Sequence, residues 1–210
     1  MPDLADLRAT AKQHFERSEY AESLACCERL IQAEPENAVN WLKAADNLQY
    51  LGRYDESLQY CDRAITLDPR NPLAFICKAS GLMKLERLDE VICNCGAAME
   101  LSPRLDETFA YRGIAFAGKG LQELCLHVEY LDRGSDAAQI RASAARAISE
   151  FKRAIADLSL VKEDNDRERS LISSLADTIS LLDGSQTSRR SLEGQLQTLE
   201  STVGKAATSV

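Results

Sequence analysis

Cysteine is the residue type in this sequence whose spacing most invites chemistry. Seven cysteines are present, and Cys26-Cys27 and Cys93-Asn94-Cys95 form close pairs. Structural zinc sites prefer thiols separated by about two to four residues on a turn, and neither pair has that spacing. An odd number of thiols in a chain long enough to build its own core also argues against a disulfide framework. We therefore expect reduced thiols and no metal site.

The histidines are the other candidates for chemistry. His14 and His127 are the two imidazoles that could act as general bases, and His14 shares a repeat position with apolar Leu48 and Leu82, which places it in or near the core. The sequence has no Gly-rich phosphate loop, no Gly-x-Ser-x-Gly nucleophile elbow and no His-Glu-x-x-His zinc motif. The sequence therefore predicts no catalytic residues, no enzyme activity and no cofactor.

Charge and hydropathy exclude two further classes of partner. Lys and Arg number 25 against 33 Asp and Glu, a formal net charge of −8, and an acidic chain repels the phosphates that dominate non-specific nucleic-acid binding. The segment from Met1 to Phe15 lacks the basic start and apolar block of a secretory signal. No uncharged apolar run approaches the roughly 18 residues that span a bilayer. We expect no nucleic-acid or membrane partner, and a cytoplasmic location.

The elements that must position any binding site follow a repeat of 34 residues. Pro35, Pro69 and Pro103 are spaced by this period, and each follows a helical pattern. Three further positions of the repeat keep their character. One holds a large residue (Leu7, Trp41, Phe75 and Phe109), the second a small residue (Ala11, Ala45, Ala79 and Gly113), and the third a cysteine (Cys27, Cys61 and Cys95). Large and small residues in this alternation favour helices that pack closely in pairs.

This pattern resembles the tetratricopeptide repeat family, whose unit of about 34 residues is a helix, a turn and a second helix with a proline near its end. The second repeat is the closest match, with residues Trp41, Ala44, Ala45, Leu48, Gly52, Tyr54, Cys61, Ala64 and Pro69 at the motif positions. Ala44-Ala45 replaces the family's Leu-Gly pair, and Leu48 and Cys61 replace aromatic residues, but all of these can fill apolar space. The resemblance implies an all-α, right-handed solenoid of helix hairpins with a concave groove.

The period also sets the expected domain boundaries. Repeats are expected at about 4–37, 38–71, 72–105 and 106–133, so that residues 1–133 form one repeat domain. The fourth repeat keeps its first helix, but Glu129 and Asp132 occupy core positions of its second helix. Residues 134–210 are expected to form a separate helical extension.

The extension begins with an apolar stripe. From Ile140 to Val161, apolar residues follow alternating steps of four and three, which predicts one apolar helix face. The stripe is consistent with a helix that caps the last repeat, or with a coiled coil, since its register continues to Leu182. Whether residues 136–182 form one helix or two stays open, because the stretch from Lys162 to Arg169 is highly charged.

A last short stripe runs from Leu192 to Val203 and suggests a helical hairpin. Its apolar face is narrow, so it could dock on a partner or on a second copy of the chain. The segment from Gly204 to Val210 is small and polar, and we expect it to be disordered.

By resemblance, a ligand groove would be lined by the first helix of each repeat, on the face that points away from the second helix. The candidate groove residues are Arg8, Lys12, Phe15, Leu42, Lys43, Asp46, Tyr50, Ile76, Cys77, Ser80, Met83, Lys84, Ala110, Tyr111 and Ile114. This set is basic at one end and apolar at the other, which suits an extended or helical peptide with an acidic end. An ordinary solvated face is the alternative interpretation of the same residues.

Some members of the family grip the terminal carboxylate of chaperone tails with lysine, asparagine and arginine. The matching positions here hold Arg8, Lys12, Lys43, Leu73 and Cys77, so one cation is kept, both asparagines are lysines and two ligands are lost. We therefore do not expect binding of chaperone tails.

The expected function is that of an adaptor or scaffold that binds a protein or peptide partner in its groove. Two alternatives remain open at this point. One is a structural homo-oligomer assembled through the C-terminal helices, and the other is a chaperone that holds substrates for secretion.

Overall fold

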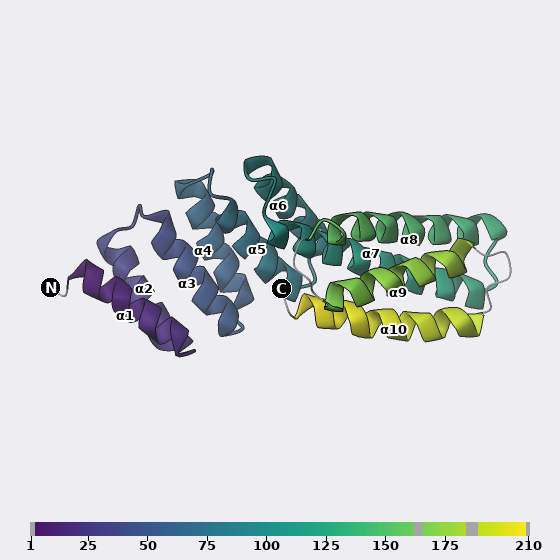
Figure 1. The fold of residues 1–210 in the computed structure, drawn as a ribbon, viewed down its shortest axis with the longest axis horizontal. Coiled ribbons are helices and arrows are strands. Elements are labelled where there is room, and N and C mark those ends of the chain that lie inside the picture. The colour runs from purple at the N-terminus through teal and green to yellow at the C-terminus, as the bar shows by residue number, and fades with distance from the viewer. Residues whose placement is uncertain (1–2, 162–165, 184–188, 209–210) are drawn as a thin grey trace. The chain divides into compact units, whose positions relative to one another are not determined.

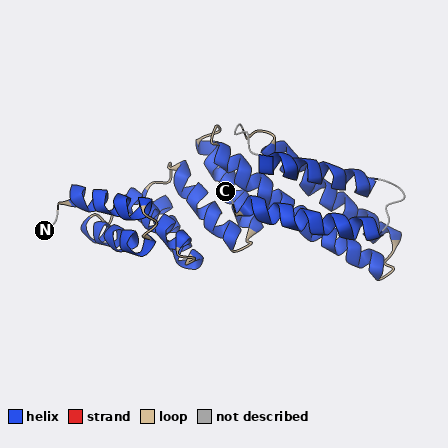
Figure 2. Cartoon of the chain, turned by 60° about the horizontal axis from the view of Figure 1, so that its bottom comes forward, coloured by secondary structure: helices blue, strands red, loops and turns tan. Residues whose placement is uncertain are grey.

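The computed structural model describes residues 3–161, 166–183 and 189–208, except for the side chains of 189 and 190. All regular structure in these ranges is helical (Figures 1 and 2). The chain divides into two compact units, Met1–Arg104 and Leu105–Val210. Within the described ranges, we find no helix long and apolar enough to cross a membrane.

The N-terminal unit consists of three helix hairpins. Its helices are α1 (Leu4–Glu16), α2 (Tyr20–Ala33), α3 (Ala38–Tyr50), α4 (Tyr54–Leu67), α5 (Pro72–Lys84) and α6 (Leu88–Leu101). Each helix packs against the next along the chain, and α3 also packs against α5. The sequence prediction of stacked helix hairpins is confirmed for these three repeats.

The same local devices recur in each hairpin at the 34-residue period. Asp3, Asn37 and Asn71 cap the first helices, because each side chain accepts a hydrogen bond from the backbone N–H two residues later. The turns between the helices place Ser18, Gly52 and Glu86 in the left-handed region, at φ of 60°, 74° and 56°. Glycine adopts this conformation without strain, so the second repeat has the best turn residue of the three.

The core of each hairpin forms where the small repeat positions meet. Ala11, Ala45 and Ala79 are all buried, as are Cys27, Cys61 and Cys95. Hydroxyl groups join the paired helices in the first two repeats, because Ser23 and Ser57 each donate a hydrogen bond of 3.0 Å, to the carbonyl oxygens of Ala11 and Ala45 respectively. The cysteines therefore serve as small core side chains.

Removal of a cap should weaken the N-terminal unit measurably. Asn71→Ala is expected to lower its free energy of unfolding by about 1 kcal/mol, because the backbone N–H of Leu73 loses its acceptor. Chemical denaturation measures the change. Asn71→Ser should restore most of the stability, whereas Asn94→Ala, within α6, should have little effect. Equal losses for Asn71→Ala and Asn94→Ala would contradict the assigned cap.

The C-terminal unit is a bundle of four helices. These are α7 (Asp106–Asp132), α8 (Ala137–Leu158), α9 (Asp166–Asp183) and α10 (Arg189–Ala207). Consecutive helices pack against each other, and α10 packs against α7, which closes the ring. Phe151, Leu171, Leu175, Leu192 and Leu199 fill its interior and are almost fully buried.

The fourth repeat is the main departure from the sequence prediction. It forms the single 27-residue helix α7, and residue 120, which corresponds to the turn residues of the other repeats, lies inside that helix. Gly120 instead allows close approach of α8, because a Cβ there would lie 2.3 Å from Cε1 of Phe151. The boundary between the units consequently lies after Arg104, not at residue 133.

The C-terminal segments also differ in detail from expectation. Residues 136–182 contain two helices, α8 and α9, and residues 162–165 of the charged stretch lie outside the described residues. Gly204 to Ala207 are helical where the sequence predicts disorder, and Ala206 is buried. Residues 209 and 210 lie outside the described residues as well.

Candidate functional site

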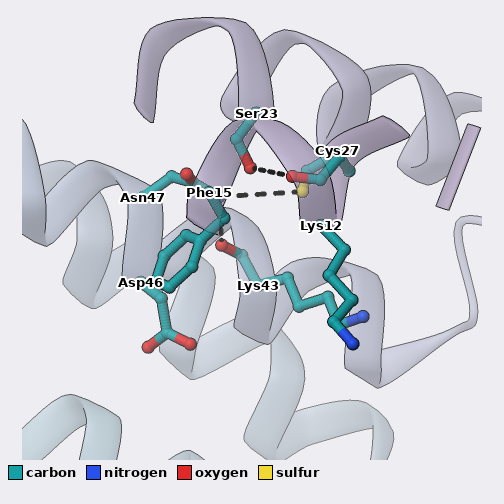
Figure 3. Close-up of a pocket in the computed structure, with 8 residues that line it drawn as sticks. Lys12, Phe15, Ser23, Cys27, Lys43, Asp46 and Asn47 are labelled. Atoms are coloured by element: carbon teal, nitrogen blue, oxygen red, sulfur yellow. Dashed lines mark hydrogen bonds between the residues drawn. The ribbon is translucent and has the colours of Figure 1, made fainter. Parts of the chain in front are cut away.

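A hollow of about 180 Å³ opens on the N-terminal unit among its first three helices. Its lining residues are Ala11, Lys12 and Phe15 from α1, Ser23 and Cys27 from α2, and Lys43, Asp46 and Asn47 from α3 (Figure 3). The hairpin turn after α1 brings α2 against it, and the capped start of α3 returns the chain to the same place. The hollow is therefore built by one complete repeat and the first helix of the next.

The floor of the hollow is formed by polar side chains with fixed positions. The side-chain amide of Asn47, which is 1% exposed, donates hydrogen bonds to the carbonyl oxygen of Lys43 at 2.8 Å and to Sγ of Cys27 at 3.8 Å. The Oδ1 atom of Asn47 is buried and has no hydrogen-bond partner in the described part of the chain. A buried acceptor without a donor is costly, so Asn47 weakens the packing at this point.

The thiol of Cys27 contributes an unreactive wall. Burial raises the pKa of Cys27 to about 11, an effect that the charge of Lys43 only partly opposes. Because the thiolate is the nucleophilic form, this cysteine stays protonated near neutral pH and does not act as a nucleophile.

The rim carries the charges. The side chains of Lys12 and Lys43 are exposed and reach toward the same side of the hollow, whereas the Asp46 carboxylate points to another side (Figure 3). Asp46 Oδ1 accepts a hydrogen bond of 3.1 Å from Sγ of Cys77. Burial raises the pKa of the Asp46 carboxyl above its ordinary value, while the Cys77 thiol and the charge of Lys43 act in the opposite direction.

An aromatic cluster extends the site beyond the hollow. Phe15, which lines the hollow, contacts Tyr20 and Tyr50 edge-on, with ring centroids 5.5 and 5.4 Å apart. The rings of Tyr20 and Tyr50 are stacked at 4.5 Å. Tyr50 is nevertheless 61% exposed, so part of this aromatic cluster is open to a partner.

Several predicted groove residues do meet at this site. Lys12, Phe15, Lys43 and Asp46 line the hollow, and Tyr50 joins it through the ring of Phe15.

Other predicted groove residues lie apart from the hollow. Arg8 forms an ion pair with Glu34, and Leu42 packs half-buried against the core. On α5, Ser80 is half-buried and Lys84 is exposed.

The remaining predicted groove residues are buried. Ile76, Cys77 and Met83 on α5 are at most 9% exposed, because α3 packs on α5 and Gln49 Nε2 donates a 2.7 Å hydrogen bond to the carbonyl oxygen of Cys77. Ala110, Tyr111 and Ile114 are likewise buried, and belong to α7 in the other unit. These six side chains therefore present little surface to a partner.

The sequence prediction missed Ala11, Ser23, Cys27 and Asn47. It considered only the face of each first helix that points away from the second helix, whereas the hollow lies over the junction of α1, α2 and α3. One signal was available in Asn47, a polar residue at a position that the helical period directs into the core.

The histidines and any cluster of metal-binding side chains are the remaining candidates for chemistry. No group of three or more His, Cys, Asp or Glu side chains within the described ranges is arranged to hold a metal ion. His14 is half-buried with Nδ1 at 2.6 Å from Oε2 of Glu19, and His127 is buried with Nδ1 at 2.9 Å from Oγ of Ser143. Neither histidine lines the hollow.

The stacked hairpins and their lateral hollow define a helical-repeat protein. Residues 38–71 match the family model described as tetratricopeptide repeat, and these residues are α3, α4 and the turn that follows. The chain therefore contains a tetratricopeptide repeat at residues 38–71.

Solved structures share the fold at low sequence identity. The structure titled "MamA RS-1 ArsTM double mutant" is 14% identical, with a TM-score of 0.62, and the match covers 96% of this chain and 97% of that one. The Arabidopsis OM64 TPR domain is 16% identical, with a TM-score of 0.50, over 51% of this chain and 89% of its own. No curated protein matches the sequence.

Proposed function

We propose that the N-terminal unit is a protein-interaction module that binds an extended peptide segment carrying an acidic residue. The observation that carries the proposal is a hollow lined by two exposed lysines and by Phe15, whose ring contacts the exposed Tyr50. The chain has a net charge of −8, whereas Lys12 and Lys43 bring positive charge to the hollow, with Lys12 Nζ 3.6 Å from Oε1 of Glu16. Such a site suits an acidic peptide, because complementary charge favours encounter and an aromatic side chain adds contact area.

Other functions are less well supported by the same contacts. The clamp for chaperone tails is incomplete, since Arg8 is paired with Glu34 and Cys77 is buried. A homo-oligomer through the C-terminal helices was suggested by their apolar stripes, yet Phe151, Leu175 and Leu199 of these stripes are buried inside one bundle. The stripes therefore give no separate support for self-association.

Affinity capture with charge-reversed variants tests the proposal. The intact chain and the double variant Lys12→Glu, Lys43→Glu are each used to capture proteins from native lysate, with quantification by mass spectrometry. The variant is expected to lose about tenfold or more of any specific partner, since attraction at the rim becomes repulsion. Arg29→Glu, Arg70→Glu is the matched control, because it makes the same change of charge at exposed sites outside the hollow.

The control variant should retain the partner that the hollow variant loses. Equal recovery with both variants would remove the hollow from the binding surface, provided that circular dichroism shows both to be folded.

A further inference from the structure

Two of the buried cysteines meet where the second hairpin packs against the third. Cys61 lies on α4 and Cys77 on α5, and these two helices pack against each other (Figure 1). The sulfur atoms are 3.4 Å apart, and the Cys61 thiol donates a hydrogen bond to Sγ of Cys77. A disulfide bond is about 2.0 Å long, so closing the gap requires an approach of about 1.4 Å. Side-chain rotation can close a gap of this size, because each sulfur swings about its Cα–Cβ bond.

Core packing alone does not require a pair of thiols in contact. Cys27 occupies the position of Cys61 in the first repeat and is equally buried. The residue sixteen positions after Cys61 is Cys77, whereas the residue sixteen positions after Cys27 is Lys43. The Sγ atom of Cys27 instead accepts a hydrogen bond of 3.8 Å from the Asn47 amide. The first repeat thus uses the same core thiol without the second cysteine.

The contacts of Cys77 hold its thiol in the protonated form. Its Sγ donates a hydrogen bond of 3.1 Å to Oδ1 of Asp46 and accepts one of 3.4 Å from Nε2 of Gln49. The contact with Cys61, burial and the charge of Asp46 raise the pKa of Cys77 well above its ordinary value. Because the thiolate is the reactive form, oxidation of this thiol near neutral pH requires a strong oxidant or a long exposure.

We infer that Cys61 and Cys77 form an oxidisable pair, which a hydroperoxide converts into a disulfide between α4 and α5. The oxidant reaches Cys77 first, because Cys77 is 8% exposed and Cys61 is fully buried. The Cys77 sulfur, after losing its proton, attacks one peroxide oxygen, and the O–O bond breaks. With hydrogen peroxide, the departing hydroxide takes up a proton and becomes water, which leaves a sulfenic acid on Cys77.

Cys61 completes the reaction without access to solvent, since the two sulfurs are already in contact. Its sulfur loses a proton and attacks the sulfur of Cys77, the S–S bond forms and the S–O bond breaks. The departing hydroxide takes up the proton as a second water. In sum, two thiols are oxidised, one peroxide is reduced, and the second and third hairpins become covalently linked.

Peptide mapping of the intact chain after treatment with hydrogen peroxide tests the inference. Trypsin should release Cys61 in the peptide 54–63 and Cys77 in the peptide 71–78, each as the only cysteine of its peptide. With the remaining thiols blocked by iodoacetamide, mass spectrometry is expected to find these two peptides linked, and dithiothreitol should separate them. Cys77→Ser should abolish the linked pair, whereas Cys27→Ser, which removes a buried thiol outside the pair, should not.

The rate of linkage tests the contact with Asp46. Asp46→Asn is expected to speed the linkage by about fivefold, because loss of the charge beside Cys77 makes its thiolate easier to form. Asp55→Asn is the matched control, since Asp55 is exposed at the start of α4, and it should leave the rate unchanged. Equal rates for both variants would show that Asp46 does not restrain the Cys77 thiol.

The disulfide should also stabilise the N-terminal unit, because it restricts the unfolded chain between residues 61 and 77. The midpoint of thermal unfolding of this unit is expected to be about 5 °C higher in the oxidised chain than in the reduced one. Cys77→Ser treated with the same peroxide should show no such increase.

Three results of the mapping would overturn the inference. One is recovery of Cys61 and Cys77 as free thiols after the peroxide has oxidised the exposed Cys93. The others are oxidation of Cys77 to a sulfinic acid without linkage, and linkage of Cys77 to a different cysteine. None of these results involves a partner of the hollow, so the test is independent of the proposed function.

Discussion

Arg112→Ala is expected to lower the free energy of unfolding of the C-terminal unit by about 3–5 kcal/mol. Arg112 Nε donates a hydrogen bond of 2.7 Å to Oδ2 of Asp157, and Arg112 Nη2 donates one of 2.7 Å to Oδ1. The Asp157 side chain is only 8% exposed, so removal of the arginine leaves a buried carboxylate without its main cation. Thermal or urea denaturation of the intact chain measures the loss.

A matched control separates burial from mere charge pairing. Arg153, whose side chain is 58% exposed, pairs with Glu150 and lies over the Phe116 ring, and Arg153→Ala is expected to change stability by about 1 kcal/mol or less. The double variant Arg112→Leu, Asp157→Leu should recover much of the stability that Arg112→Ala loses, because no charge is then buried. If Arg112→Ala and Arg153→Ala had equal effects, Asp157 would not be the buried partner that the structure describes.

Gly120→Val should destabilise the same unit by about 3 kcal/mol, at the upper end of what overpacking usually costs. A Cβ at residue 120 would lie 2.3 and 2.4 Å from two atoms of the Phe151 ring, and valine adds two further methyl groups. Phe151 is fully buried, so its ring has no open space into which to move. Denaturation followed by circular dichroism measures the effect.

The control for this prediction is another glycine in a helix of the same unit. A Cβ at Gly194 would have no neighbour within 4 Å, so Gly194→Val should leave stability nearly unchanged. Adding Phe151→Leu to Gly120→Val should restore part of the loss, because the smaller side chain makes room. A Gly120→Val protein as stable as the unaltered chain would show that α7 and α8 do not approach each other at this point.

The 34-residue period was sufficient to predict the first three hairpins, because their turns, caps and small core residues are all local. The fourth repeat shows where this reasoning ends. Gly120 occupies the turn position of the period, but whether the helix breaks there depends on Phe151, which lies far along the chain. The glycine alone does not show that α8, a distant part of the sequence, packs against it.

The candidate site was predictable to a similar extent. Lys12, Phe15, Lys43 and Asp46 follow from the outward face of the first helices. Cys77 was placed on the same face, yet it is buried because α3 packs on α5, and no local pattern reports how closely successive repeats approach. Asn47 was missed because its place in the hollow depends on how α1, α2 and α3 meet, which no local pattern reports.

Photo-crosslinking from Tyr50 tests most directly whether the hollow of the N-terminal unit is the surface that binds partners. Benzoylphenylalanine replaces Tyr50, which is 61% exposed beside the hollow, and in a second protein it replaces Leu160, which is 55% exposed in the other unit. We expect discrete protein adducts from position 50 in native lysate, lost when Lys12→Glu and Lys43→Glu are added. Adducts that persist with those substitutions, or that form only from position 160, would contradict the account.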